Sequence, residues 1–243
     1  MAKLNYTYTF IFIILFIVIS FITFQAFQAF KKYEGFSNNN IIDYGKYGKV
    51  KTNTIEVADN VYKTPFFPKK LCKKLIDSYE EFLNERQLLH NDSFIKKNDL
   101  DHLDSNDLKY EPGMTAKLNK IPKIYNYFNH YVKKYLFPIV NKKYPYFDGR
   151  KISPPYILRY ESDKFYESKM DIHIDNEQVP IIIYLNDDFE GGGTYFPLLK
   201  KTINGNTGDL IFYPGGVTHP HGGKKITKGK RYILLFSIID PEI

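Results

Sequence analysis

The chain has 243 residues, which suits one domain of ordinary size with an accessory segment. Hydrophobic residues make up 43% and charged residues 25%, a globular balance that excludes a disordered or fibrous chain. The single cysteine, Cys72, excludes an intrachain disulfide and a zinc site built on two thiolates, so a metal site would depend on histidines and carboxylates. The net charge is +7, but no nucleic-acid recognition module is visible, and we expect no nucleic-acid partner.

The N-terminal segment is apolar. Between Lys3 and Lys31 lie 27 uncharged residues, Leu4 to Phe30. As a helix this stretch would reach roughly 40 Å at 1.5 Å per residue, enough to span a hydrocarbon layer of about 30 Å. We therefore predict that residues 1–32 form an uncleaved, single-pass transmembrane anchor, with the membrane as a partner. A cleaved signal peptide is the alternative, and lysines on both sides leave the orientation open.

The next two regions differ in pattern. Residues 33–56 hold several glycines and a run of asparagines without a sustained period, which predicts a tether. Residues 57–150 are predicted to be a helical support region, because apolar residues recur at helical spacing in two places. The first helix ends at about Leu83, and the second runs from about Ile121 to Leu136 and is stopped or kinked at Pro138.

Residues 151–243 alternate short β-rich runs with Gly, Pro and Asn turns, which predicts a β sandwich or barrel. The predicted strands are Tyr156–Tyr160, Met170–Ile174, Pro180–Leu185, Gly193–Phe196, Asp209–Tyr213 and Arg231–Ile239. The predicted fold class is thus mainly β with flanking helices (α+β), preceded by an N-terminal transmembrane helix.

A pair of metal-ligating residue types lies in one of these strands. Alternate residues of a strand point to the same face, so His173 and Asp175 would project together. A third ligand must come from elsewhere, and the Gly-rich stretch further on offers His219 and His221. Two histidines and one carboxylate leave three coordination positions open, the arrangement of non-haem Fe(II) oxygenases. Ten residues after His221, Arg231 offers a guanidinium that suits a carboxylate co-substrate.

The order of these motifs resembles the catalytic domain of the prolyl 4-hydroxylases and procollagen lysyl hydroxylases. The resemblance rests on the H-x-D pair, the segment Glu190–Pro197, the segment Gly208–Phe212, and His221 followed by Gly229 and Arg231. It implies a double-stranded β-helix, a jelly-roll relative, in which residues 57–243 form one dioxygenase domain and residues 151–243 its catalytic core. It also implies Fe(II), 2-oxoglutarate as co-substrate, and L-ascorbate.

The resemblance assigns roles to individual residues. His173, Asp175 and His221 would be the iron ligands, and His219 would be a loop residue beside them. Arg231 would pair with the distal carboxylate of 2-oxoglutarate. Thr194 and Tyr160 would be further contacts of the co-substrate.

The activity that the resemblance implies is hydroxylation of peptidyl proline with O2 and 2-oxoglutarate, releasing succinate and CO2, by a membrane-anchored enzyme. Its substrate would be a protein or peptide of collagen-like or Pro-rich sequence. A peptidyl lysine hydroxylase is the alternative, because Arg231 stands where prolyl hydroxylases mostly have lysine. A catalytically inactive jelly-roll binding module is the third hypothesis.

The composition is rich in Lys, Asn, Ile, Tyr and Phe, which share AT-rich codons, and giant DNA viruses encode members of this family. The expected location is therefore a virion or host membrane, or the endoplasmic reticulum. The oligomeric state, the substrate sequence and the source organism stay open at this point.

Overall fold

A computed structural model of the chain describes residues 18–25, 41–91, 115–117, 122–147, 149–162 and 169–239. The chain divides into two units, Met1–Ile41 and Ile42–Ile243. Of the predicted anchor the structure describes only residues 18–25, which are helical, and the rest of residues 1–32 lies outside the described residues. Within the part of the chain that the structure describes, no helix is both long and apolar enough to cross a membrane. The anchor therefore stays a prediction.

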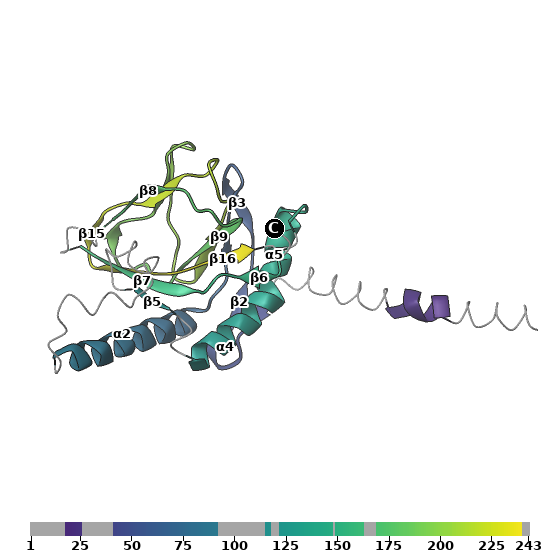
Figure 1. Ribbon diagram of the computed structural model, residues 1–243, viewed down its shortest axis with the longest axis horizontal. Helices are drawn as coiled ribbons and strands as arrows, with labels where there is room; N and C mark the ends of the chain where they lie inside the picture. Colours follow the sequence, from purple (N-terminus) through teal and green to yellow (C-terminus); the bar gives the residue numbers. More distant parts are fainter. Residues whose placement is uncertain are drawn as a thin grey trace, which may run out of the picture. The chain divides into compact units, whose positions relative to one another are not determined.

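The second unit is built on two antiparallel sheets (Figure 1). The larger sheet has the order β3 (Ile55–Ala58), β4 (Val61–Pro65), β13 (Asp209–Phe212), β9 (Val179–Tyr184), β16 (Lys230–Ile239), β7 (Tyr156–Glu161) and β5 (Thr115–Lys117), with β6 (Lys151–Ile152) also paired to β16. The smaller sheet has the order β12 (Lys201–Ile203), β11 (Thr194–Phe196), β14 (His221–Gly223) and β8 (Met170–His173). Two short pairs complete the strands: β1 (Ile41–Asp43) with β2 (Lys49–Lys51), and β10 (Glu190–Gly191) with β15 (Ile226–Lys228). Two sheets with few helices fit the predicted mainly-β, jelly-roll class.

The larger sheet is covered on both faces, because successive side chains of β9 belong alternately to two hydrophobic clusters. Ile181 and Ile183 belong to the hydrophobic cluster that includes the helices, while Ile182 and Tyr184 belong to a second cluster. Because successive side chains of a strand point to opposite faces, β9 separates these two cores. The second cluster also holds Phe196 and Ile203 of the smaller sheet, so it fills the space between the sheets.

Helix α2 (Lys69–Asn91) packs one apolar stripe on the larger sheet. Leu71, Cys72, Leu75 and Tyr79 recur at helical spacing and are buried. Cys72 is thus a core residue, and the helix extends past the predicted end at Leu83. The 3-10 turn η1 (Gly45–Tyr47) lies beside α2.

The second predicted helix is longer than expected. It consists of α4 (Pro122–Tyr131), a π-helical turn η4 (Val132–Leu136) and α5 (Phe137–Lys143). Of the two alternatives predicted at Pro138, the stop is wrong, because the helix continues to Lys143, and the kink stays a prediction. Pro138 lies in the first turn of α5, directly after the π turn, where a proline's missing N–H costs little.

The predicted strands of residues 151–243 are confirmed, whereas two features before them were not foreseen. The hairpin β3–β4 joins the larger sheet from the boundary between the predicted tether and the predicted support region. In the predicted tether, Ile42 and Tyr44 are buried in the core. The Tyr44 ring stacks on Tyr131 at 4.4 Å between ring centroids. The apolar residues around Tyr44 are too few for the sequence to predict this packing.

Candidate metal centre and co-substrate pocket

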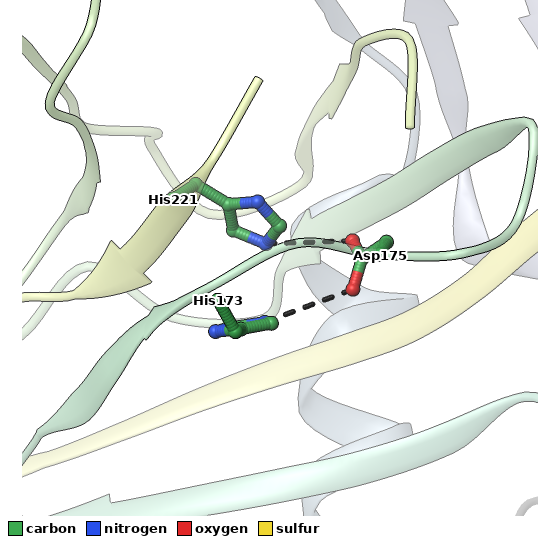
Figure 2. A group of neighbouring side chains, drawn as sticks. All are labelled: His173, Asp175 and His221. Carbon is green, nitrogen blue, oxygen red and sulfur yellow. Dashed lines mark ion pairs between the residues drawn. The ribbon is translucent and has the colours of Figure 1, made fainter. Parts of the chain in front are cut away.

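Two neighbouring strands of the smaller sheet bring three metal-ligating side chains together. His173 ends β8, Asp175 follows two residues later, and His221 begins β14. In the antiparallel pairing of β8 and β14, His173 and His221 lie directly opposite each other. Figure 2 shows the two imidazoles and the Asp175 carboxylate pointing toward one another.

The distances within this triad suit a shared metal ion. One ligand atom from each of His173, Asp175 and His221 lies within 4.8 Å of the others. His173 Nε2 is 3.7 Å from Asp175 Oδ1, and His221 Nε2 is 3.4 Å from Asp175 Oδ2. Two imidazole nitrogens and one carboxylate are the donor set of non-haem Fe(II) sites, so these residues fit the metal that the sequence predicts.

The backbone orients both imidazoles. His173 Nδ1 lies 2.8 Å from the Asp171 carbonyl oxygen, and His221 Nδ1 lies 3.2 Å from the His219 carbonyl oxygen. If each Nδ1–H donates to its carbonyl, each Nε2 presents a lone pair toward Asp175. Burial lowers the pKa of His221, although the negative charge of Asp175 acts to raise it. The lowered pKa favours the neutral imidazole that binds metals.

Arg231 lies on the larger sheet, in β16, and is only 1% exposed. Its guanidinium carbon is 5.4 Å from the ring centroids of both Tyr160 and Tyr184, and its Nη2 donates to Thr194 Oγ1 at 3.4 Å. Among the described residues, Arg231 Nε has no hydrogen-bond partner. A buried guanidinium with an unmatched donor fits a carboxylate ligand, which accepts two parallel hydrogen bonds.

The six residues that the resemblance assigns to iron or to the co-substrate all line one cavity. The cavity-lining residues among them are Tyr160, His173, Asp175, Thr194, His221 and Arg231. The structure thus brings the predicted site residues together, and their individual roles stay predictions. His219 points elsewhere, since its ring nitrogens contact Thr218 Oγ1 at 2.9 Å and the Asp59 carbonyl oxygen at 3.0 Å.

Sequence reasoning missed two tyrosines, Tyr213, which lines this pocket, and Tyr184, which lies beside Arg231. Tyr184 lies beside Arg231, and its hydroxyl contacts Thr194 Oγ1 at 3.0 Å and donates to the Ile203 carbonyl oxygen at 3.1 Å. Tyr213 lines the cavity beside the triad, and burial raises its pKa well above the ordinary tyrosine value. Both occur at the ends of apolar runs, where the sequence shows only a strand.

Comparison with known proteins gives a consistent result. The chain is 26% identical over 187 residues to rat procollagen-lysine,2-oxoglutarate 5-dioxygenase 1, a match that covers 75% of this chain and 24% of the relative. It is 26% identical over 203 residues to human procollagen-lysine,2-oxoglutarate 5-dioxygenase 2, covering 80% of this chain and 26% of that protein. The chain therefore spans about a quarter of the length of these curated relatives.

Among solved structures, a viral collagen prolyl hydroxylase from Paramecium bursaria Chlorella virus-1 is 17% identical and matches with a TM-score of 0.45, over 76% of this chain and 100% of that one. No family model matches the sequence. The homologues of this chain are procollagen-lysine 2-oxoglutarate dioxygenases, which confirms the resemblance to the prolyl and lysyl hydroxylase family that its motifs carry.

Proposed function

We propose that the protein is an Fe(II)/2-oxoglutarate-dependent dioxygenase that hydroxylates a side chain of a protein or peptide. The observation that carries the proposal is that the triad and Arg231 line the same cavity, so a metal and a dicarboxylate can be held side by side. When bound, iron and 2-oxoglutarate supply the oxidising power that places an oxygen atom of O2 into a C–H bond, with release of succinate and CO2.

The residues of the chain then have distinct tasks. His173, Asp175 and His221 would hold Fe(II) by two nitrogens and a carboxylate. Arg231 and Thr194 would bind the distal carboxylate of 2-oxoglutarate, because both present donors to the same part of the cavity. The rings of Tyr160 and Tyr184 flank the guanidinium and keep water from it, which strengthens its attraction for an anion.

Two target residues have support. The names of the curated relatives and the arginine at position 231 favour peptidyl lysine, which we place first. The segment Glu190–Pro197, which resembles that of prolyl hydroxylases, favours peptidyl proline. In both cases a protein or peptide is the substrate, of collagen-like or Pro-rich sequence.

The test is turnover by the full chain with Fe(II), L-ascorbate, 2-oxoglutarate and two matched collagen-like peptides, one with lysine and one with proline at the same position. We expect succinate formation and a peptide mass gain of one oxygen atom, both lost in His173→Ala. Oxygen on the lysine peptide alone supports the first target, and oxygen on the proline peptide alone supports the second. An unaltered chain that binds neither Fe(II) nor 2-oxoglutarate would refute the proposed site and favour an inactive binding module.

Ascorbate has the role of keeping the iron reduced between turnovers. We expect that omitting it lowers the number of turnovers per protein molecule, whereas the first turnover stays unaffected. Equal turnover numbers with and without ascorbate would contradict this part of the proposal.

A single-pass anchor formed by residues 1–32 would place the enzyme on a membrane, and a virion or host membrane or the endoplasmic reticulum is its proposed location. The support is the uncharged stretch of 27 residues between Lys3 and Lys31. A charged residue at the centre of a membrane helix costs about 2.5–3.5 kcal/mol on insertion scales. The double variant Phe16→Arg, Ile19→Arg should therefore leave the membrane fraction while the unaltered chain resists alkaline extraction. Co-extraction of both forms would refute the anchor.

A further inference from the structure

Tyr213 directly follows β13 of the larger sheet and reaches the triad from that side. It is 1% exposed, and its hydroxyl lies 2.9 Å from His221 Nε2 and 3.3 Å from Asp175 Oδ2. Its ring packs edge-on against Phe196 at 5.0 Å between ring centroids. The phenol is thus held in place within hydrogen-bond distance of two of the three proposed metal ligands.

When the triad holds a metal, Asp175 Oδ2 is the acceptor for the proton of the Tyr213 hydroxyl. A phenol carries a single O–H, so it donates one hydrogen bond. His221 Nδ1 faces the His219 carbonyl oxygen, which leaves the lone pair of Nε2 as the metal donor. With that lone pair committed to a metal, the Tyr213 proton is donated to Asp175 Oδ2, a charge-assisted hydrogen bond.

The two oxygens of Asp175 therefore differ. Oδ1 faces His173 Nε2 at 3.7 Å, whereas Oδ2 faces His221 Nε2 at 3.4 Å and also accepts from Tyr213. A carboxylate oxygen that already accepts a proton donor is a weaker metal ligand than its free neighbour. We propose that Tyr213 is a positioning residue that directs Asp175 to bind the metal through one oxygen, Oδ1, and so preserves an open position for the two donor atoms of the co-substrate. This inference rests on the proposed function of the triad.

Titration of the full chain with Mn(II), without 2-oxoglutarate, tests this role independently of activity. Loss of a group that orients a metal ligand typically weakens metal binding about 10- to 100-fold. We expect a loss of that size in Tyr213→Phe, which removes only the hydroxyl and keeps the buried ring. Tyr232→Phe is the matched control, because the Tyr232 hydroxyl donates to Glu80 at 2.8 Å on the far side of the larger sheet. The control should bind Mn(II) like the unaltered chain.

Mn(II) affinity of Tyr213→Phe within about twofold of the unaltered chain would overturn the inference. A second measurement needs no variant: the Fe(III)-loaded chain should lack the visible absorption of an iron–phenolate bond. Appearance of that absorption would place the phenol oxygen on the metal itself and would also overturn the positioning role. His173→Ala distinguishes failure of the Tyr213 inference from failure of the proposed function. If it binds Mn(II) as tightly as the unaltered chain, the triad is not the metal site and the proposed function fails as well.

Discussion

Arg231 is the largest fully buried side chain among the described residues, so its positive charge lies in the interior of the protein. Two tyrosine rings and the Thr194 hydroxyl contact the guanidinium, and its Nε remains without a partner within the described part of the chain. Burying an ionised group without a counter-charge is costly. A carboxylate ligand would recover that cost, which gives the pocket a preference for dianionic co-substrates over neutral ones.

The first prediction concerns this guanidinium. Arg231→Lys keeps the charge but loses the planar pair of donors, and a hydrogen bond to a charged group contributes about 1.5–3 kcal/mol. We expect the dissociation constant for 2-oxoglutarate to rise about tenfold or more while the Mn(II) affinity stays unchanged. Calorimetry on the Mn(II)-loaded chain measures both. Arg150→Lys, at an exposed position, is the control and should match the unaltered chain, and equal 2-oxoglutarate binding by Arg231→Lys would contradict the assignment.

At the scale of elements, α2 is held to the larger sheet by a polar contact as well as by its apolar stripe. Glu80 accepts hydrogen bonds from Arg159 Nη1 at 2.8 and 2.9 Å and from the Tyr232 hydroxyl at 2.8 Å. Burial opposes the charge of Arg159, but the hydrogen bond and charge of Glu80 more than compensate and raise its pKa. Because Arg159 and Tyr232 face each other across β7 and β16, the helix is tied to the strand that carries Arg231.

A glycine in the turn before β13 contacts the segment that leads into α2. Gly208 has φ +92°, its carbonyl oxygen accepts from the N–H groups of Phe66 and Phe67, and a Cβ there would meet the Phe67 carbonyl oxygen. We expect Gly208→Ala to lower the free energy of unfolding by about 2–4 kcal/mol, because backbone strain and a steric clash add. Gly45→Ala is the matched control, since φ is +58° and nothing lies within 4 Å of the added Cβ. Its cost should be about 1–2 kcal/mol, and equal losses in urea unfolding would refute the clash.

The elements with a long, regular pattern could be predicted from the sequence. The run Arg231–Ile239 is long, apolar and rich in β-forming residues, and the stripe from Leu71 to Tyr79 recurs at helical spacing, which identifies β16 and α2. The hairpin β3–β4 and the buried Tyr44 could not, because strands of four and five residues carry too few alternations and a single aromatic shows its burial only through its partners. The triad could be predicted because two of its ligands lie two residues apart in the chain, whereas Tyr213 reaches the cavity from the end of a strand whose sequence is simply apolar.

At the scale of the whole second unit, the site depends on both sheets at once. The triad belongs to β8, β14 and the segment after β8, while Arg231, Tyr160 and Tyr184 belong to the larger sheet. The core between the sheets includes Tyr160 and Tyr213, which also line the pocket. Conditions that loosen this core should therefore reduce metal and co-substrate binding together.

Alkaline pH destabilises both cores of this unit, because Cys72 in one and Tyr160 in the other keep protons that the unfolded chain releases. Burial raises the pKa of the Cys72 thiol from 9.0 to about 12, and burial raises the pKa of Tyr160 from 10.0 to about 12, with Arg231 opposing the latter shift. At about pH 8 and below both groups keep nearly all of their protons in either state, and they leave stability almost unchanged. Between pH 9 and 12 the unfolded chain loses protons that the folded chain retains, so the free energy of unfolding falls as pH rises.

For a single group this loss approaches about 1.4 kcal/mol per pH unit. We expect urea unfolding at about pH 8, 9.5 and 10.5 to show a decline that steepens above pH 9, where Cys72 begins to contribute. In Cys72→Ala the free energy of unfolding should fall by about 1 kcal/mol less between pH 9.5 and 10.5, because the variant lacks the thiol whose proton the folded chain retains. The small cavity left by the substitution lowers stability equally at every pH and does not change the slope. Parallel pH profiles for the two proteins would mean that the Cys72 thiol ionises in the folded core as readily as in the unfolded chain.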